Sequence, residues 1–272
     1  MPHKAERDAA PGSGAIVVRH VDFAFGGNAP ILRDLSFEVA SGEFFVLLGP
    51  SGCGKSTALN LIAGFETPSK GEIRAGARLV EDAGRDRVVI FQDSDSLYNW
   101  LTVLDNVAFP LRVTGVGESE RRARAREALK LVGLQGHESK FPPELSGGMK
   151  QRTQLARALV LQSPILLMDE PFAALDAQTR AILQDELVQL SIQMKRTVLF
   201  ITHDISEAIL LGDRVAIMRA GPASSIKETI DIALPRPRRR GSVEFGELYE
   251  RINRSISEEV QRALRAEDSL LQ

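Results

Sequence analysis

The chain has 272 residues, of which 43 % are hydrophobic and 26 % are charged, as in an ordinary globular protein. Its 34 Lys and Arg residues are balanced by 36 Asp and Glu residues, which argues against a protein that binds nucleic acid through bulk positive charge. The single cysteine cannot form an internal disulfide, and the longest apolar runs fall far short of the about 20 residues of a membrane-spanning helix. Because the first residues also lack the apolar segment of a secretory signal, the composition leads us to expect a soluble cytoplasmic protein of undefined activity.

Short apolar runs alternate with helical patterns along most of the chain, after a leader at residues 1–14 that we expect to be disordered. This alternation predicts an α/β fold built from βαβ units around a mainly parallel sheet. The first strands have no helix between them, which predicts an antiparallel β region flanking that sheet. The strands are expected at residues 16–25, 35–39, 44–48, 88–91, 165–168, 197–201 and 215–218.

Helical patterns fill most of the intervals between these strands. Residues 95–160 are mostly helical and lie between two expected strands, which predicts a helical subdomain inserted into the sheet region. The main domain is expected over residues 15–234, up to the prolines and arginines of LPRPRRR. In the tail, residues 235–272, apolar side chains recur every three or four residues, as on one face of an amphipathic helix. The other helices are expected at residues 57–64, 118–132, 147–162, 177–195 and 204–211.

A phosphate-binding loop is indicated by residues 49–56, GPSGCGKS, which match the pattern G-x-x-x-x-G-K-[ST]. The motif lies between an apolar strand and a helical run, which is the context that it requires. Glycines let successive backbone N–H groups point at phosphate oxygens, and the start of the following helix favours an anion. Lys55 would supply a charge for the terminal phosphates, and the Ser56 hydroxyl would bind Mg²⁺. The nucleotide-binding residues are expected to be Gly49, Pro50, Ser51, Gly52, Cys53, Gly54, Lys55, Ser56 and Thr57, with the Cys53 thiol inert.

Two adjacent carboxylates stand at the end of another apolar strand, in the run ILLMDEP of residues 165–171. Ligands of parallel α/β sheets bind at the carboxyl ends of the strands. Asp169 could hold Mg²⁺ through its water shell, and Glu170 could accept a proton from an attacking water. A solvated strand end is the alternative interpretation, and the phosphate loop upstream favours the functional one.

Two further polar residues follow apolar strands. His203 comes after residues 197–201, where it could reach a γ-phosphate, although a single histidine is more often a structural or surface residue. Gln92 comes after residues 88–91, and its amide could bind Mg²⁺ or orient a water molecule. By itself, such a glutamine would be read as an ordinary loop residue.

A second helix start suited to an anion occurs in LSGGMKQR, residues 145–152. Ser146 is a good residue for a helix start, and Gly147 and Gly148 leave backbone N–H groups exposed. The chain therefore carries two phosphate-type sites but only one lysine-containing loop. The second is either a capped helix without a ligand, or it serves a nucleotide that is held elsewhere.

The ordered set of motifs resembles the ATP-binding cassette (ABC) family over about residues 16–222. The set comprises GPSGCGKST, Gln92, LSGGMKQR, ILLMDEP, a D-loop at Ala174–Asp176, and His203. The resemblance implies a P-loop NTPase core that binds ATP and Mg²⁺. In that family two cassettes pack head to tail, so that the signature motif of one chain closes on the ATP held by the other. This arrangement would account for two anion sites in one chain.

The resemblance also implies a role for each matching residue. Glu170 corresponds to the catalytic base and His203 to the switch histidine. Phe25 falls where the family places an aromatic ring against adenine, often a tyrosine, so that the change to Phe loses only a hydroxyl. The signature contacts in trans would come from Ser146, Gly147, Gly148 and Gln151, the D-loop carboxylate from Asp176, and the metal ligands from Ser56, Gln92 and Asp169.

The segment after Gln92 is rich in aromatic and apolar residues where we expect an exposed loop. Exposed apolar clusters mark binding surfaces. In importer cassettes this region receives a helix of the membrane subunit, and Leu97, Tyr98 and Trp100 are the expected contacts, with Trp100 as the anchor. Local packing within the helical subdomain is the alternative.

The phrases DEPFAALDAQTR and LPRPRRR…FGELYERI most resemble the nitrate/sulfonate/taurine importer branch. This resemblance implies an ATP-hydrolysing subunit at the cytoplasmic face of the cell membrane, which drives a separate permease. Its other partners would be a second cassette, expected to be identical, and an extracytoplasmic solute-binding protein. The alternatives are a soluble regulatory or assembly ATPase of the same family, and a phosphotransferase that uses the same loop.

Overall fold

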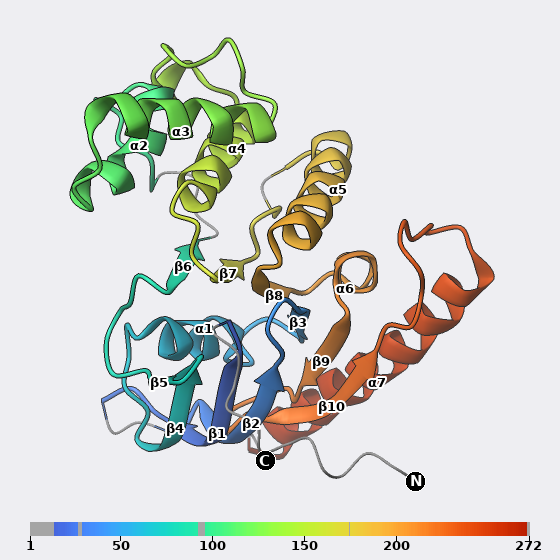
Figure 1. Ribbon diagram of the computed structural model, residues 1–272. Coiled ribbons are helices and arrows are strands. Elements are labelled where there is room, and N and C mark those ends of the chain that lie inside the picture. Colours follow the sequence, from blue (N-terminus) through green and yellow to red (C-terminus); the bar gives the residue numbers. More distant parts are fainter. Residues whose placement is uncertain (1–13, 27–28, 92–95, 174, 271–272) are drawn as a thin grey trace, which may run out of the picture.

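The computed structural model describes residues 14–26, 29–91, 96–173 and 175–270, with side chains except at 190, 191, 194 and 263–270 (Figure 1). In these residues the strands form two sheets, and the helices of residues 103–159 gather in a lobe that stands apart from the strand-rich body. The α/β class, the antiparallel flanking region and the inserted helices agree with the expected fold. None of the described helices combines the length and the apolar character needed to cross a membrane.

The larger sheet has six strands in the order β10-β9-β3-β8-β7-β6. Every neighbouring pair in it is parallel except β10 and β9. Strands β3 and β8 are buried along their whole length, and β7 nearly so, which explains their largely apolar sequences. The strands are β3 (Phe44–Leu48), β6 (Arg87–Ile90), β7 (Ile165–Asp169), β8 (Thr197–Thr202), β9 (Arg214–Met218) and β10 (Ile226–Asp231).

The smaller sheet is antiparallel in its printed pairings and has the order β2-β1-β4-β5. Strand β2 alternates largely between buried and exposed residues, as expected for a sheet with one face against a core. The strands β4, β5 and β10 were not expected from the sequence, because their runs carry several charged residues and no continuous apolar stretch. The strands are β1 (Ile16–Phe23), β2 (Leu32–Val39), β4 (Lys70–Ala75) and β5 (Arg78–Leu79).

The helical lobe contains α2 (Val103–Val113), α3 (Glu118–Leu131) and α4 (Gly147–Leu159), which contact one another. Helix α2 was missed in the sequence because Pro110 lies inside it, and proline normally interrupts a helix. Thr102 begins α2 by accepting a hydrogen bond from the Asp105 amide at 3.1 Å.

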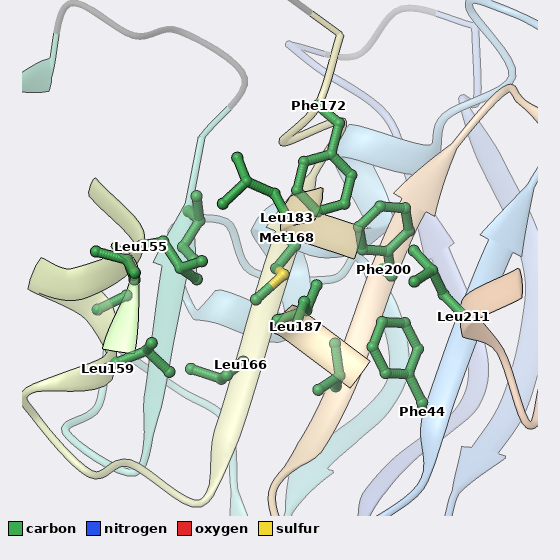
Figure 2. Close-up of a cluster of buried hydrophobic side chains, with 14 of the residues drawn as sticks. Phe44, Leu155, Leu159, Leu166, Met168, Phe172, Leu183, Leu187, Phe200 and Leu211 are labelled. Atoms are coloured by element: carbon green, nitrogen blue, oxygen red, sulfur yellow. The ribbon is translucent and has the colours of Figure 1, made fainter. Parts of the chain in front are cut away.

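The remaining helices are α1 (Lys55–Ala63), α5 (Ala177–Met194), α6 (Ile205–Leu211) and α7 (Val243–Leu270). Figure 2 shows the core on one face of the large sheet, where Phe44, Met168 and Phe200 from neighbouring strands meet Leu183 and Leu187 of α5. A second cluster fills the space between the two sheets and α1. Both faces of the parallel strands are therefore covered, and their carboxyl ends are left to carry the polar residues.

The segment after Leu234 packs on the rest of the molecule. Phe245 and Ile252 of α7 are 3 % and 0 % exposed and belong to the core cluster of the large sheet. Arg238 donates hydrogen bonds to the carbonyls of Ile209 and Gly212 at the end of α6, at 2.7 and 2.5 Å. Burial lowers the pKa of Arg238 to about 10. The amphipathic helix expected in the tail is thus present as α7, with its apolar face against the body.

Candidate active site

Three loops meet at one edge of the large sheet because their strands are neighbours and parallel. Leu48 at the end of β3 pairs with Thr202 at the end of β8. Ile201 of β8 pairs in turn with Asp169 at the end of β7. The phosphate loop, the carboxylate pair and His203 all follow these strand ends. The structure therefore brings together the three motifs that the sequence separates widely.

Residues 49–54 form a tight loop between β3 and α1. Gly52 and Gly54 have φ values of 78° and 91°, in the left-handed region that glycine alone adopts readily. A Cβ atom on Gly54 would lie 2.8 Å from Cδ2 of Leu32, so no side chain fits there without movement. The loop leads directly into α1, whose first N–H groups and dipole favour an anion.

Lys55 begins α1 and is only 6 % exposed. Its ammonium donates to the carbonyls of Gly49 and Pro50, both at 2.8 Å, and so lies across the loop. Burial raises the pKa of the nearby Asp169 carboxyl, and the charge of Lys55 opposes part of this rise. The positive charge is thus held between the loop and the end of β7, which is the position needed to attract phosphate oxygens.

Cys53 is turned into the core beneath the loop and is 1 % exposed. Burial raises the pKa of its thiol, which disfavours the reactive thiolate. Cys53 could therefore contact a nucleotide only through its backbone, and its inert thiol agrees with the sequence-based interpretation.

Ser56 and Asp169 lie in contact although they come from different loops. The Ser56 hydroxyl hydrogen-bonds to the Asp169 carboxylate and lowers its pKa, but burial is the larger effect and raises it. The nearby charge of Glu170 raises that pKa further. A hydroxyl and a carboxylate are oxygen donors of the kind that Mg²⁺ takes from a protein when phosphates supply the rest. The residues present thus fit a magnesium ion.

Glu170 adopts a backbone conformation that is unusual for a residue with a side chain. Its φ is 44°, and its amide donates to the carbonyl of Ile201 at 3.1 Å. Its carboxylate Oε2 lies 3.0 Å from Nδ1 of His203. Left-handed backbone at a residue other than Gly costs of order 1–3 kcal/mol and is concentrated at functional sites. The strained backbone thus occurs at the residue whose carboxylate contacts His203.

The start of α4 is an exposed helix N-terminus. The Ser146 hydroxyl accepts a hydrogen bond from the Met149 amide at 3.3 Å and caps the helix. A Cβ on Gly147 would meet nothing, whereas one on Gly148 would lie 3.0 Å from Thr179 of α5. Helix α4 belongs to the lobe and α1 to the body (Figure 1). The two helix starts suited to an anion thus belong to different parts of the molecule.

Gln151 departs from the expectation that its side chain faces a second cassette. It is 4 % exposed, and its Nε2 donates to the carbonyl of Pro171 in the same chain. The reason is its place on the inner face of α4, among buried neighbours. Gln151 joins the signature helix to the segment that follows Glu170.

The remaining expected residues have different outcomes. The Asp176 carboxylate accepts hydrogen bonds from the amides of Gln178 and Thr179, at 3.1 and 3.0 Å, and these bonds lower its pKa. Asp176 thus caps the start of α5 in its own chain. Gln92 and Ala174 lie outside the described residues. Phe25 is 45 % exposed, and its ring lies nearly perpendicular to that of Phe23, with ring centroids 4.8 Å apart.

The segment expected to dock a membrane subunit is partly buried. Leu97 is 5 % exposed and belongs to the core cluster that also contains residues of α2 and α4, so it is not the surface contact that was expected. Trp100 is 74 % exposed, and its ring lies 5.2 Å from that of Tyr98, which in turn lies 4.6 Å from Phe109. Tyr98 and Phe109 line a groove of about 640 Å³ between the body and the lobe.

Arg157 of α4 was not anticipated. It lines the same groove, and its guanidinium donates to the carbonyl and the hydroxyl of Ser96, at 2.8 and 2.7 Å. It thus holds Ser96 against α4. The sequence offers one weak signal, which is an arginine between the buried positions of α4.

The sequence profile of the family described as "ABC transporter" matches residues 32–173, from β2 to the segment after Glu170. The chain belongs to the ABC transporter family. It is an ATP-binding subunit of that family and hydrolyses ATP.

Individual relatives agree with this assignment. A taurine import ATP-binding protein of Pseudomonas aeruginosa is 50 % identical over 74 % of this chain and 76 % of its own length. A nitrate import ATP-binding protein of Synechococcus elongatus is 45 % identical over 83 % of this chain, which spans 35 % of that protein. The dimeric structure of the ATP-binding cassette MJ0796 bound to ADP and Pi superposes with a TM-score of 0.70 at 30 % identity, covering 81 % of this chain and all of that one. The chain therefore resembles the nitrate/sulfonate/taurine branch.

Proposed function

We propose that this ABC subunit powers a separate membrane permease that imports a solute of the nitrate, sulfonate or taurine type. The observation that carries the proposal is the exposed Trp100 at a groove lined by Tyr98, Phe109 and Arg157. An aromatic side chain that is largely in water beside a groove is a suitable anchor for a partner helix. The taurine and nitrate import relatives support this choice of solute class.

In the proposed reaction the phosphate loop and Lys55 bind and orient the triphosphate of ATP. Mg²⁺ held near Ser56 and Asp169 would neutralise charge on the phosphates during transfer. Glu170 accepts the proton of the attacking water, and His203 holds the carboxylate of Glu170 through the 3.0 Å contact. Phe25, whose ring is partly exposed, would stack on the adenine ring.

The proposed working unit is a homodimer of cassettes in head-to-tail order. Two observations support it: the two anion-binding helix starts belong to different parts of one chain, and the similar cassette MJ0796 is dimeric with ADP and Pi. In such a dimer Ser146, Gly147 and Gly148 of one copy contact the γ-phosphate held by the other. The unit would lie on the cytoplasmic face of the membrane and work with an extracytoplasmic solute-binding protein.

The test is purification of the tagged chain from mild detergent, with identification of the proteins that accompany it. The proposal expects a permease with several membrane spans, whereas a soluble partner alone would favour a regulatory or assembly ATPase. Trp100→Ala should weaken assembly by about 2 kcal/mol or more, roughly 30-fold in affinity, and leave ATP binding unchanged. Val243→Ala, at an equally exposed apolar residue, is the matched control with 74 % exposure. Normal assembly of Trp100→Ala would contradict the proposed docking surface.

A further inference from the structure

A buried carboxylate lies next to residues 202–204, which contain His203 and are called the histidine loop below. Glu207 is in the first turn of α6 and is 5 % exposed. Among the described residues, no side-chain hydrogen bond or ion pair joins Glu207 to Glu170 or to the phosphate loop. A charged group in such a place is costly unless its oxygens are hydrogen-bonded, so the partners of both oxygens are informative.

One oxygen of Glu207 fixes the two residues that flank His203. The Thr202 hydroxyl donates to Oε2 of Glu207 at 2.7 Å and accepts from the Asp204 amide at 3.0 Å. The Asp204 carboxylate accepts in turn from the amides of Ser206 and Glu207, at 2.7 and 3.1 Å. The backbone on both sides of His203 is thereby tied to the start of α6.

The other oxygen of Glu207 faces α5. Nε2 of Gln184 donates to Oε1 at 3.0 Å, and Nε of Arg180 lies 3.9 Å from the same oxygen. Arg180 also donates through Nη2 to the carbonyl of Leu175 at 2.9 Å, directly before Asp176. From the tail, Arg240 donates to Oε1 of Gln184 at 3.2 Å. One carboxylate thus joins the histidine loop, the D-loop and the C-terminal segment.

We propose that Glu207 is a positioning residue for ATP hydrolysis, which holds His203 at its distance from Glu170 through Thr202 and Asp204. Because both oxygens have partners in a buried place, moving residues 202–204 would leave at least one polar group unpaired, and this resists displacement. Burial also raises the pKa of Glu207, in keeping with a group enclosed by the fold. The inference rests on the roles proposed above for Glu170 and His203.

The first test is Glu207→Gln, which keeps the shape of the side chain but turns one acceptor into a donor. The amide can no longer accept from both Thr202 and Gln184. We expect kcat for ATP to fall about tenfold or more, because small misplacements of reacting groups cost up to about 100-fold. ATP affinity should stay within about twofold, because the phosphate loop is untouched. A purely structural role would instead lower the melting temperature and affect kcat and affinity together.

Three further variants keep the test informative if Glu207→Gln fails to fold. In the double variant Glu207→Gln with Gln184→Glu, the new carboxylate accepts from residue 207, and the carbonyl of residue 207 accepts from Thr202. This exchange should restore kcat. Thr202→Val, which removes the hydroxyl at nearly constant volume, should reproduce the loss, whereas Thr202→Ser should not. Wild-type kcat in Thr202→Val or in Glu207→Gln would overturn the inference.

The last arm measures whether Glu207 acts through His203. In a His203→Ala background, single-turnover hydrolysis should show no further loss on adding Glu207→Gln, since a residue that acts through a missing partner has nothing left to position. Additive losses would overturn the inference. If His203→Ala alone left hydrolysis unchanged, the proposed role of His203 would fail instead, so the two failures can be told apart.

Discussion

At the scale of single residues, Glu170 has a strained backbone and a side chain that contacts His203. Its φ is 44°, and the next residue is a proline. Its amide donates to the Ile201 carbonyl, and its carboxylate contacts His203. A strained backbone persists only where surrounding contacts determine it. The carboxylate is therefore oriented before any substrate binds.

Glu170→Gln should leave ATP binding intact and lower kcat by roughly 10²–10⁴-fold, because the amide keeps the shape of the side chain but accepts no proton. The measurement is single-turnover hydrolysis together with ATP affinity. Glu250→Gln, at an exposed residue of α7, is the control. Hydrolysis at near the wild-type rate in Glu170→Gln would show that another group is the base.

Gly54→Ala and Gly52→Ala form a matched pair within the phosphate loop. Both positions are left-handed, so each alanine should cost about 1–2 kcal/mol of stability from backbone strain. Only the alanine at position 54 also meets Leu32, at 2.8 Å, whereas position 52 has nothing within 4 Å. Urea unfolding should therefore show the larger loss for Gly54→Ala. Equal losses would mean that Leu32 moves aside freely.

At the scale of elements, α6 is fixed at both ends. The Asp204 side chain caps its start beside His203, and Arg238 binds the carbonyls at its end. The end of a helix carries partial negative charge, which a cation stabilises. A short helix with both ends bound can hold the adjacent histidine loop rigidly.

Arg238→Ala should lower the free energy of unfolding by about 2–3 kcal/mol, because hydrogen bonds from a charged group are lost and buried carbonyls are left unpaired. Arg239→Ala, at the exposed neighbouring arginine, is the control. Chemical denaturation of both variants is the measurement. Similar values for the two would indicate that water replaces the guanidinium at the helix end.

Patterns within one element could be predicted from the sequence, and contacts between distant elements could not. The apolar runs of β3, β7 and β8 are buried on both faces, so their residues alone locate them within one or two positions. The phosphate loop and the carboxylate pair follow from the same runs. Helix α2 was missed because of Pro110. The inward turn of Gln151 and the partners of Glu207 depend on segments far apart in the chain, and no local pattern encodes them.

At the scale of the whole molecule, the exposed start of α4 lies in the lobe while the phosphate loop lies in the body. In the proposed dimer, each chain therefore supplies the phosphate loop of one composite site and the start of α4 for the other. This geometry leads to a test in which two inactive variants are mixed.

Lys55→Ala removes the charge that binds phosphate in its own chain, and Ser146→Arg blocks the phosphate of the partner chain. Each homodimer should be inactive. A mixture should contain heterodimers with one intact site and one doubly damaged site, and ATP should stabilise these more than either homodimer. The measurement is ATP-dependent dimer formation by tagged variants, with the separate variants as controls. Equal behaviour of all three species would contradict composite sites.

The place of β3 in the sheet has a consequence for synthesis on the ribosome. Phe44 pairs with Val198 of β8, and Phe45 pairs with Arg214 of β9, so both neighbours of β3 are translated long after it. Pairings between residues so distant in sequence form slowly, since a long loop must close first. The nascent chain thus carries its phosphate loop on an unpaired apolar strand until the second half emerges. Such a strand is prone to aggregation, so nucleotide binding should appear late in synthesis and chaperones should matter most before β8 and β9 are made.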